Sequence, residues 1–373
     1  MDPAARLRDA MVDSLTAAGV LRDPRWVEAF REVPRHAFLP GFFVQRPDGT
    51  WDAVTRDHPD HLALVYRNQV CVTQLNGDDR AWEQALAGGP VVGVPTSSSS
   101  MPAIMAIMLE ALDAPAGSRV LEIGTGTGYN AALLTHVLGA DRVTSIDVDP
   151  GVLARARDRL TAAGYSPTCV AGDGEQGHPP RAPYDRVLGT CAVSRVPPAW
   201  LAQTAPGGLV VTTFNRPIGA GLVRLTVRDG VATGPVMAED GRFMPLRAHH
   251  AGWADEALGH ALTAEPGSSR GTPLSAAMVL DPARGFEFFA GLALPDVVTA
   301  GDPPRLAHPD GSWVRHRGAT VDQGGPRRLW DLAEAAYDQW RSLGRPRRHH
   351  FTFTATPTTQ YFALPDTPHT WPL

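Results

Sequence analysis

The sequence predicts an α/β protein with a mostly parallel, doubly wound sheet, an N-terminal helical region and a C-terminal α+β extension. Between residues 101 and 214, short apolar runs typical of buried strands alternate with longer helical segments. A turn rich in glycine follows the first of these strands, and after about Gly230 the alternation stops. We therefore expect three regions, a helical and loop region on the substrate side over 1–95, a cofactor domain over 96–235 and a substrate-recognition extension over 236–373.

Composition excludes several classes of protein. The 373 residues are 43% hydrophobic and 20% charged, which is typical of a soluble globular protein. The net charge of −5 indicates no nucleic-acid surface, and neither a membrane span nor a signal peptide is visible. Three cysteines without C-x-x-C spacing fit a reducing cytoplasm. The chain has no lysine, which excludes Schiff-base chemistry. We expect a cytoplasmic protein, with a monomer favoured.

The N-terminal region begins with two predicted helices. An amphipathic pattern over 4–18 indicates the first. Asp23 followed by Pro24 is typical of a helix start, and this second helix should end near Val33, before a proline. Residues 40–95 are rich in Gly, Pro and Asp, so we expect loops and short strands there.

The central region supplies the strands and helices of the predicted sheet. Strands are expected at 119–123, 143–147, 168–171, 184–190 and 208–214. Helices are expected at 101–112, 128–138, 151–163 and 198–205. In such sheets ligands bind outside the carboxyl ends of the strands. The extension should contain a helix at 329–342 and antiparallel strands at 351–355 and 360–364, and its tryptophans suggest a core of its own.

The most informative turn is VLEIGTGTGYN, residues 120–130. Gly124, Gly126 and Gly128 allow a tight turn and close approach to a ligand, beside the free N–H groups of the next helix. A nicotinamide-binding turn reads G-x-G-x-x-G. Here the third glycine comes one residue early and Glu122 precedes the first, which disfavours a nicotinamide oxidoreductase. The pattern resembles the Rossmann-like cofactor turn of class I methyltransferases, which bind S-adenosylmethionine.

Two further acids follow strands of this sheet. Asp147 ends the second strand, where a carboxylate can accept hydrogen bonds from both ribose hydroxyls. The alternative role is a helix N-cap, for which Asp149 is better placed. Asp173 and Gly174 follow the third strand, where the acid could accept from an adenine amino group. Alone, this dipeptide is typical of a simple turn.

Several motifs in order resemble the protein-L-isoaspartate O-methyltransferases. They are VLEIGTGTGYNAALL, AGDGEQG, RAPYDRVLGT, PGGLVVT and RFMPL, preceded by VPRHAFLP at 33–40. The resemblance covers about residues 5–250. It implies S-adenosylmethionine as the cofactor, and a peptide or protein carboxylate as the methyl acceptor.

The serines at 97–100 match a segment that in this family reads Gln-Thr-Ile-Ser, followed by one residue and Pro. Ser98 matches the threonine and Ser100 the serine, and in the family this segment lies between the sulfonium and the substrate carboxylate. The resemblance therefore implies Ser100 as the catalytic residue, with Ser98 as the next candidate. The alternatives are a flexible loop or a cap on the helix at Met101.

The resemblance also implies a set of cofactor-binding residues. They are Ser97, Ser98, Ser100, Glu122, Gly124, Thr125, Gly126, Gly128, Asp147, Val148, Asp173, Gly174 and Thr190. The acceptor usually lies at the end of the fourth strand, at Thr190 and Cys191, and we favour a packing role for this cysteine. No metal is expected. The acids and histidines at 57–61 are better explained as a solvated loop.

The extension suggests a specialised substrate. The segments at 324–340 and 354–373 resemble extended family members associated with ribosomally made, modified peptides. We therefore predict methylation of an aspartyl side chain in a cyclised peptide, such as a lanthipeptide, lasso peptide or graspetide. The ester would close to an aspartimide, which can hydrolyse to isoaspartate.

Two alternatives to this function remain open. One is isoaspartate repair in damaged proteins. The other is a non-catalytic peptide-binding protein, against which the intact acids and Ser100 argue. Arg345, Arg347 and Arg348 could hold an acidic peptide or form a solvated face.

Overall fold

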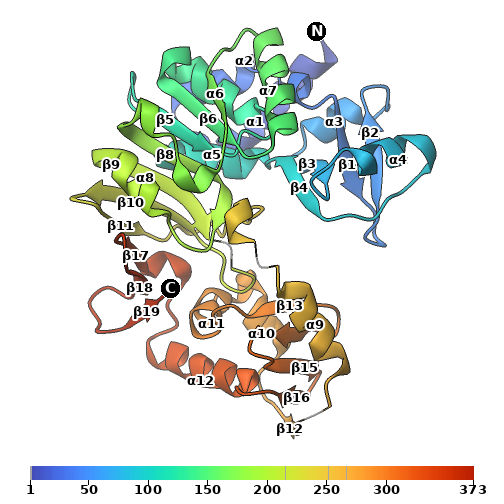
Figure 1. The fold of residues 1–373 in the computed structure, drawn as a ribbon, viewed down its shortest axis with the longest axis vertical. Helices are drawn as coiled ribbons and strands as arrows, with labels where there is room; N and C mark the ends of the chain where they lie inside the picture. Colours follow the sequence, from blue (N-terminus) through green and yellow to red (C-terminus); the bar gives the residue numbers. More distant parts are fainter. Residues whose placement is uncertain (1, 215, 251, 266) are drawn as a thin grey trace. The chain divides into compact units, whose positions relative to one another are not determined.

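The computed structural model describes residues 2–214, 216–250, 252–265 and 267–373 (Figure 1). The chain forms two compact units. The first comprises Met1–Cys191 and Ala199–Val211, and the second comprises Ala192–Pro198 and Thr212–Leu373. These boundaries do not coincide with those expected at 95 and 235, because the N-terminal sheet belongs to the same unit as the central strands. The functional roles assigned to the three regions stay predictions.

The first unit opens with the two expected helices, α1 (Pro3–Ala17) and α2 (Pro24–Glu32). Each begins with an aspartate that accepts a backbone hydrogen bond and is followed by proline. The Asp23 carboxylate accepts from the Arg25 amide at 2.9 Å. The local signals in the sequence thus place both helix starts correctly.

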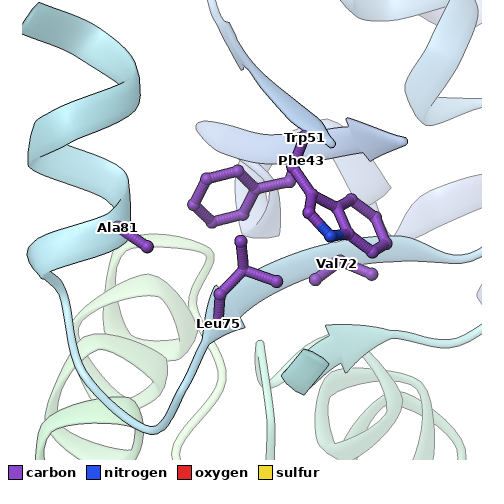
Figure 2. Close-up of a cluster of buried hydrophobic side chains, with 5 residues drawn as sticks. All are labelled: Phe43, Trp51, Val72, Leu75 and Ala81. Carbon is purple, nitrogen blue, oxygen red and sulfur yellow. The ribbon is translucent and has the colours of Figure 1, made fainter. Parts of the chain in front are cut away.

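Residues 41–99 form a small antiparallel sheet with strand order β2-β1-β3-β4. The strands are β1 (Gly41–Gln45), β2 (Trp51–Thr55), β3 (Cys71–Leu75) and β4 (Pro95–Ser99). Figure 2 shows the apolar cluster on this sheet, which comprises Phe43, Trp51, Val72, Leu75 and Ala81. Two helices here, α3 (His61–Val65) and α4 (Arg80–Gly88), are not expected from the sequence. At five and nine residues they are too short to show a helical period clearly.

The central strands form the expected parallel sheet. Strands β5 (Val120–Ile123), β6 (Val143–Asp147), β7 (Thr168–Ala171) and β8 (Tyr184–Val193) pair in parallel in the order β8-β5-β6-β7. Strand β9 (Thr204–Phe214) follows β8 in the strand order. Helix α5 (Pro102–Leu112) precedes these strands, and α6 (Tyr129–Leu138), α7 (Pro150–Ala162) and α8 (Pro198–Gln203) connect them. The α/β fold class is therefore confirmed.

The second unit contains an antiparallel ribbon in the order β19-β18-β17-β11-β10. Its strands are β10 (Leu222–Arg228), β11 (Val231–Pro235), β17 (Thr352–Ala355), β18 (Gln360–Ala363) and β19 (Thr370–Pro372). The antiparallel pairing of β17 with β18 confirms the expectation for 351–364. Residues 243–246, matched to a family strand, make only an isolated bridge between Pro245 and Ala192.

A second sheet completes this unit, with strand order β12-β16-β15-β14-β13. Its strands are β12 (Ser268–Gly271), β13 (Val298–Ala300), β14 (Arg305–Ala307), β15 (Trp313–Arg317) and β16 (Thr320–Gly324). The helices are α9 (Ala254–Thr263), α10 (Ala276–Leu280), α11 (Glu287–Ala293) and α12 (Leu329–Ser342). Trp313, Trp330 and Trp340 are buried. Among the residues described, no helix has the length and apolar character that a membrane crossing requires.

Candidate active site

The glycine turn is fixed against strand β6 by backbone hydrogen bonds. The amides of Gly124 and Thr125 both donate to the Ile146 carbonyl, at 2.8 and 3.1 Å. Gly124 has φ +101°, and a Cβ there would lie 2.7 Å from the Thr190 hydroxyl. Gly126 has φ +54°. Both backbone conformation and space therefore require glycine at the first position of the turn.

Glu122 stabilises the glycine turn from its buried side. Its side chain is fully buried and accepts hydrogen bonds from Asn130 Nδ2 at 2.7 Å and Ser145 Oγ at 2.5 Å. Ser145 is also 2.7 Å from the hydroxyl of Thr125. Burial raises the pKa of Glu122 to about 7, against the two hydrogen bonds, which lower it. The carboxyl group thus ties β5, β6 and α6 together, and any contact with cofactor stays a prediction.

Asp147 holds the turn from its solvent side. Its two carboxylate oxygens accept from the Gly126 amide at 2.9 Å and the Asp149 amide at 3.0 Å. Asp149 in turn caps α7, accepting from the amides of Gly151 and Val152. The helix cap is therefore Asp149, as the sequence favours, and Asp147 is oriented by the glycine turn itself.

The other strand ends carry the remaining predicted residues. Val148 is 41% exposed beside Asp147. Asp173 accepts from the Glu175 amide at 2.9 Å and so forms a turn, while the Gly174 carbonyl accepts from the indole of Trp200. The turn interpretation of Asp173 is therefore observed, and its predicted contact with adenine stays a prediction.

Thr190 and Cys191 end the first unit's part of β8. The Thr190 hydroxyl lies 2.9 Å from the Ile123 carbonyl and 2.7 Å from the Gly124 carbonyl, which links β8 to the start of the turn. Burial raises the pKa of the Cys191 thiol to about 12. Cys191 is therefore a poor nucleophile, in keeping with a packing role.

The serine segment is a strand and not a loop. Ser97–Ser99 end β4, where Ser98 pairs with Val72 and Ser99 with Cys71. Ser100 lies between this strand and helix α5. Helix α5 has Met101 as its N-cap residue and no side-chain cap, so the helix-cap alternative does not hold, and the loop alternative does not hold for Ser97–Ser99.

The serine strand lies directly against the glycine turn. A Cβ built on Gly126 would be 3.0 Å from the Ser98 carbonyl oxygen. Ser98 and Ser100 are both half-buried. The predicted catalytic segment and the predicted cofactor turn are therefore brought together, although they lie more than 20 residues apart in the sequence.

Gln74 joins the small sheet to the cofactor region, and the sequence analysis missed it. Its amide nitrogen donates to Asp149 at 3.0 Å, and its oxygen accepts from the Thr96 hydroxyl at 2.9 Å. The Arg155 guanidinium pairs with Asp79 at 2.9 Å across the same two regions. In the sequence, the signal for this role is a glutamine within the mainly apolar run VCVTQL, and in the structure this glutamine is buried. These contacts hold β4 over the turn.

Three residues that the sequence offers for metal or peptide binding, His58, His61 and Arg348, make other contacts in the structure. His61 is buried and its Nε2 lies 2.8 Å from the Leu39 carbonyl, while His58 accepts from the Asp60 amide. Within the described ranges, no group of three potential metal ligands is found. Arg348 is buried and donates to the Ala220 carbonyl at 2.9 Å, so it cannot reach a peptide.

Similarity to known proteins agrees with this geometry. The family described as protein-L-isoaspartate(D-aspartate) O-methyltransferase matches residues 81–249. The protein-L-isoaspartate O-methyltransferase of Methanoculleus marisnigri is 33% identical over 257 residues, 68% of this chain and 97% of the relative. That of Picosynechococcus sp. is 34% identical over 255 residues, 68% of this chain and 95% of the relative.

A solved structure extends the likeness in fold to nearly the whole chain. A protein-L-isoaspartate O-methyltransferase shares a TM-score of 0.55 at 22% identity, covering 96% of this chain and 99% of that one. At this identity the match shows the fold alone. It nevertheless shows that a fold of this extent, extension included, occurs in a protein of that name.

The parallel sheet and its glycine turn define a methyltransferase with a Rossmann-like core and S-adenosylmethionine as cofactor. The chain belongs to the protein-L-isoaspartate O-methyltransferase family. Membership in the group tied to modified peptides stays a prediction.

Proposed function

We propose that the protein transfers a methyl group from S-adenosylmethionine to the side carboxylate of an L-isoaspartyl residue in a protein or peptide. The observation that carries this proposal is the contact between the serine strand and the glycine turn, with the Ser98 carbonyl 3.0 Å from a Cβ built on Gly126. The backbone of the serine strand thus lies beside the turn that would hold the donor. The family relationship supports both the donor and the acceptor.

Asp147 is the residue that would hold the ribose. A carboxylate has about four acceptor positions and can accept from both ribose hydroxyls, and the backbone amides of Gly126 and Asp149 donate to this one. These amides also fix the direction of both oxygens. The exposed Val148 and the Asp173–Gly174 turn would then lie against the adenine, as the family pattern implies.

Methyl transfer to a carboxylate depends on the alignment of the reacting atoms more than on acid–base catalysis. A carboxylate is already ionised near pH 7. Its oxygen forms a bond to the methyl carbon while the carbon–sulfur bond breaks, and the electron pair returns to sulfur as a neutral thioether. No proton moves, so catalysis rests on holding oxygen, carbon and sulfur in line. A hydroxyl such as that of Ser100 would orient the carboxylate with one hydrogen bond.

A second candidate is methylation of an ordinary aspartyl side chain in a cyclised peptide. The ester would be attacked by the next backbone nitrogen, methanol would leave and an aspartimide would form. The resemblance of segments 324–340 and 354–373 to modified-peptide enzymes favours it. The cytoplasm is the compartment we infer for either function, in keeping with three free cysteines.

A methyl-transfer assay separates the two candidates. Labelled S-adenosylmethionine is offered with a linear isoaspartyl peptide, its aspartyl counterpart and a cyclised form of the aspartyl peptide. We expect label on the isoaspartyl peptide and none on the linear aspartyl control. Label transferred to the cyclised peptide alone, retained as the ester or released as methanol, would replace the proposal by the second candidate. Label on none of the three would overturn both.

A further inference from the structure

The segment Ala192–Pro198, which follows Cys191 directly along the chain, is held at every second residue. The Ala192 amide donates to the Met244 carbonyl at 2.8 Å, and the Ala192 carbonyl accepts from the Leu246 amide at 2.7 Å. The Ser194 amide donates to His249 Nδ1 at 3.0 Å. All of these partners lie in the second compact unit, as the segment itself does.

Val196 is the third anchored residue, and its partner is a side chain from the end of the protein. The Val196 amide donates to Gln360 Oε1 at 2.8 Å, and Gln360 Nε2 donates to the Val196 carbonyl at 2.7 Å. Val196 is buried, so both of its backbone polar groups need partners. A primary amide supplies one acceptor and two donors, and a carboxylate supplies no donor. Gln360 thereby makes the same two hydrogen bonds to Val196 that the backbone of a neighbouring strand would make.

Gln360 is held in place by the pairing of its strand. It is the first residue of β18 and pairs with Ala355 of β17 across a short hairpin. Its carbonyl accepts from the Leu373 amide at 2.9 Å. A side chain fixed in this way can hold a partner in one geometry. Between the anchors at 194 and 196, the side chains of Ser194 and Arg195 are exposed.

We propose that Gln360 is a positioning residue for the methyl acceptor, and this inference rests on the proposed function. Strand β8 carries Thr190 and Cys191, where the family meets its acceptor, and the anchored segment continues it. Holding Val196 fixes the path of the chain immediately beyond that point and the presentation of Ser194 and Arg195. The extension thus contributes to acceptor binding through one amide side chain.

The kinetic test compares Gln360→Ala with Thr354→Ala. Thr354 makes a side-chain contact of 3.1 Å to Thr233 in the same ribbon and is a matched control. We expect Gln360→Ala to raise KM for the isoaspartyl peptide about tenfold, as loss of two hydrogen bonds suggests. KM for S-adenosylmethionine should stay within about twofold in both variants. Gln360→Glu keeps only the bond from the Val196 amide and should resemble Gln360→Ala.

Hydrogen exchange of the unliganded protein gives a readout that does not depend on activity. The amide of Val196 should exchange faster in Gln360→Ala than in wild type and in Thr354→Ala. Unchanged exchange, or an unchanged KM for the peptide in an active variant, would overturn the inference. A wild-type protein that methylates no peptide would instead overturn the proposed function.

Discussion

The two units satisfy their buried acids by different means. Near the glycine turn, the buried Glu122 accepts from a serine hydroxyl and an asparagine amide, and the half-buried Asp147 accepts from two backbone amides. In the second unit, Glu287 is just as buried but accepts from the guanidinium groups of Arg242 and Arg348, at 2.7 and 3.4 Å. The same residue type is thus stabilised by neutral dipoles in one region and by full charges in the other.

This difference follows from what each region would hold. The proposed donor carries a positive sulfonium, which an arginine beside the glycine turn would repel. Neutral donors satisfy the carboxyl groups of the turn without adding such a charge. Glu287 sits in a packing region, where it also accepts from the Gly219 amide at 2.8 Å and so fixes α11. There, arginines can satisfy an acid with no such conflict.

The largest expected effect is on the Glu287 cluster. Glu287→Gln keeps an acceptor for Gly219 but removes the charge opposite Arg348, which is only 9% exposed. Breaking a buried ion pair by removing one partner destabilises a protein by about 3–5 kcal/mol. We expect the free energy of unfolding of the second unit to fall by that amount, measured by denaturant titration.

Asp240→Asn is the matched control for this variant. Asp240 pairs with the same Arg242 at 3.2 Å, but both side chains are well exposed. Exposed pairs contribute about 0–1 kcal/mol. Equal midpoints for Glu287→Gln and wild type would mean that charge pairing does not stabilise this region.

The next effect concerns the pH dependence of Glu122. Its pKa is about 7 in the folded protein against 4.5 for the ordinary value, so the folded state binds the proton more tightly. The unfolded chain ionises first, and stability therefore falls as pH rises from about 4.5 to about 7. The difference of about 2.5 pKa units corresponds to about 3 kcal/mol at full ionisation.

Glu122→Gln isolates this contribution. The amide cannot ionise, so the fall in unfolding free energy between pH 5 and pH 8 should be smaller by roughly 2–3 kcal/mol in the variant than in wild type. Denaturant titrations at the two pH values provide the comparison. Parallel pH curves for the two proteins would show that Glu122 does not titrate in this window.

Local patterns predict the turn but not its partners. Glycine spacing, the apolar strand and the acid at Asp147 all lie within one βαβ segment, and each has a local physical cause. The position of the serine segment depends on its pairing with β3, where Ser98 faces Val72. The small sheet is in turn joined to the cofactor region by a link such as Gln74 to Asp149, 75 residues apart. No local pattern encodes such a contact.

The same limit explains why the sequence does not distinguish the three C-terminal arginines. Arg345, Arg347 and Arg348 look alike in the sequence, and only the fold separates the buried Arg348 from its two exposed neighbours. A buried arginine next to an acid depends on which helix packs beside it. In this protein that helix is α11, which begins more than 50 residues earlier in the chain.

A third prediction tests Asp147, whose carboxylate near the glycine turn accepts from neutral backbone amides. Asp147→Ala removes the proposed ribose acceptor and also the bond from the Gly126 amide. We expect binding of S-adenosylhomocysteine to weaken by about ten- to a hundredfold, or about 1–3 kcal/mol for charged hydrogen bonds. Calorimetric titration measures this, with the exposed Asp158→Ala as control. Unchanged affinity would remove Asp147 from the site.

The smallest expected effect is at Ser100, where one neutral hydroxyl is proposed to orient the acceptor. Ser100→Ala should lower kcat about fivefold, since a single neutral hydrogen bond contributes about 1 kcal/mol, and it should leave the affinity for S-adenosylhomocysteine unchanged. The hydroxyl acts on the aligned pair and not on the donor alone, so the two quantities should separate. Ser98→Ala is the informative companion, because it removes the other candidate hydroxyl and keeps the Ser98 carbonyl that lies against Gly126. Full activity in Ser100→Ala, with a loss in Ser98→Ala, would transfer the orienting role to Ser98.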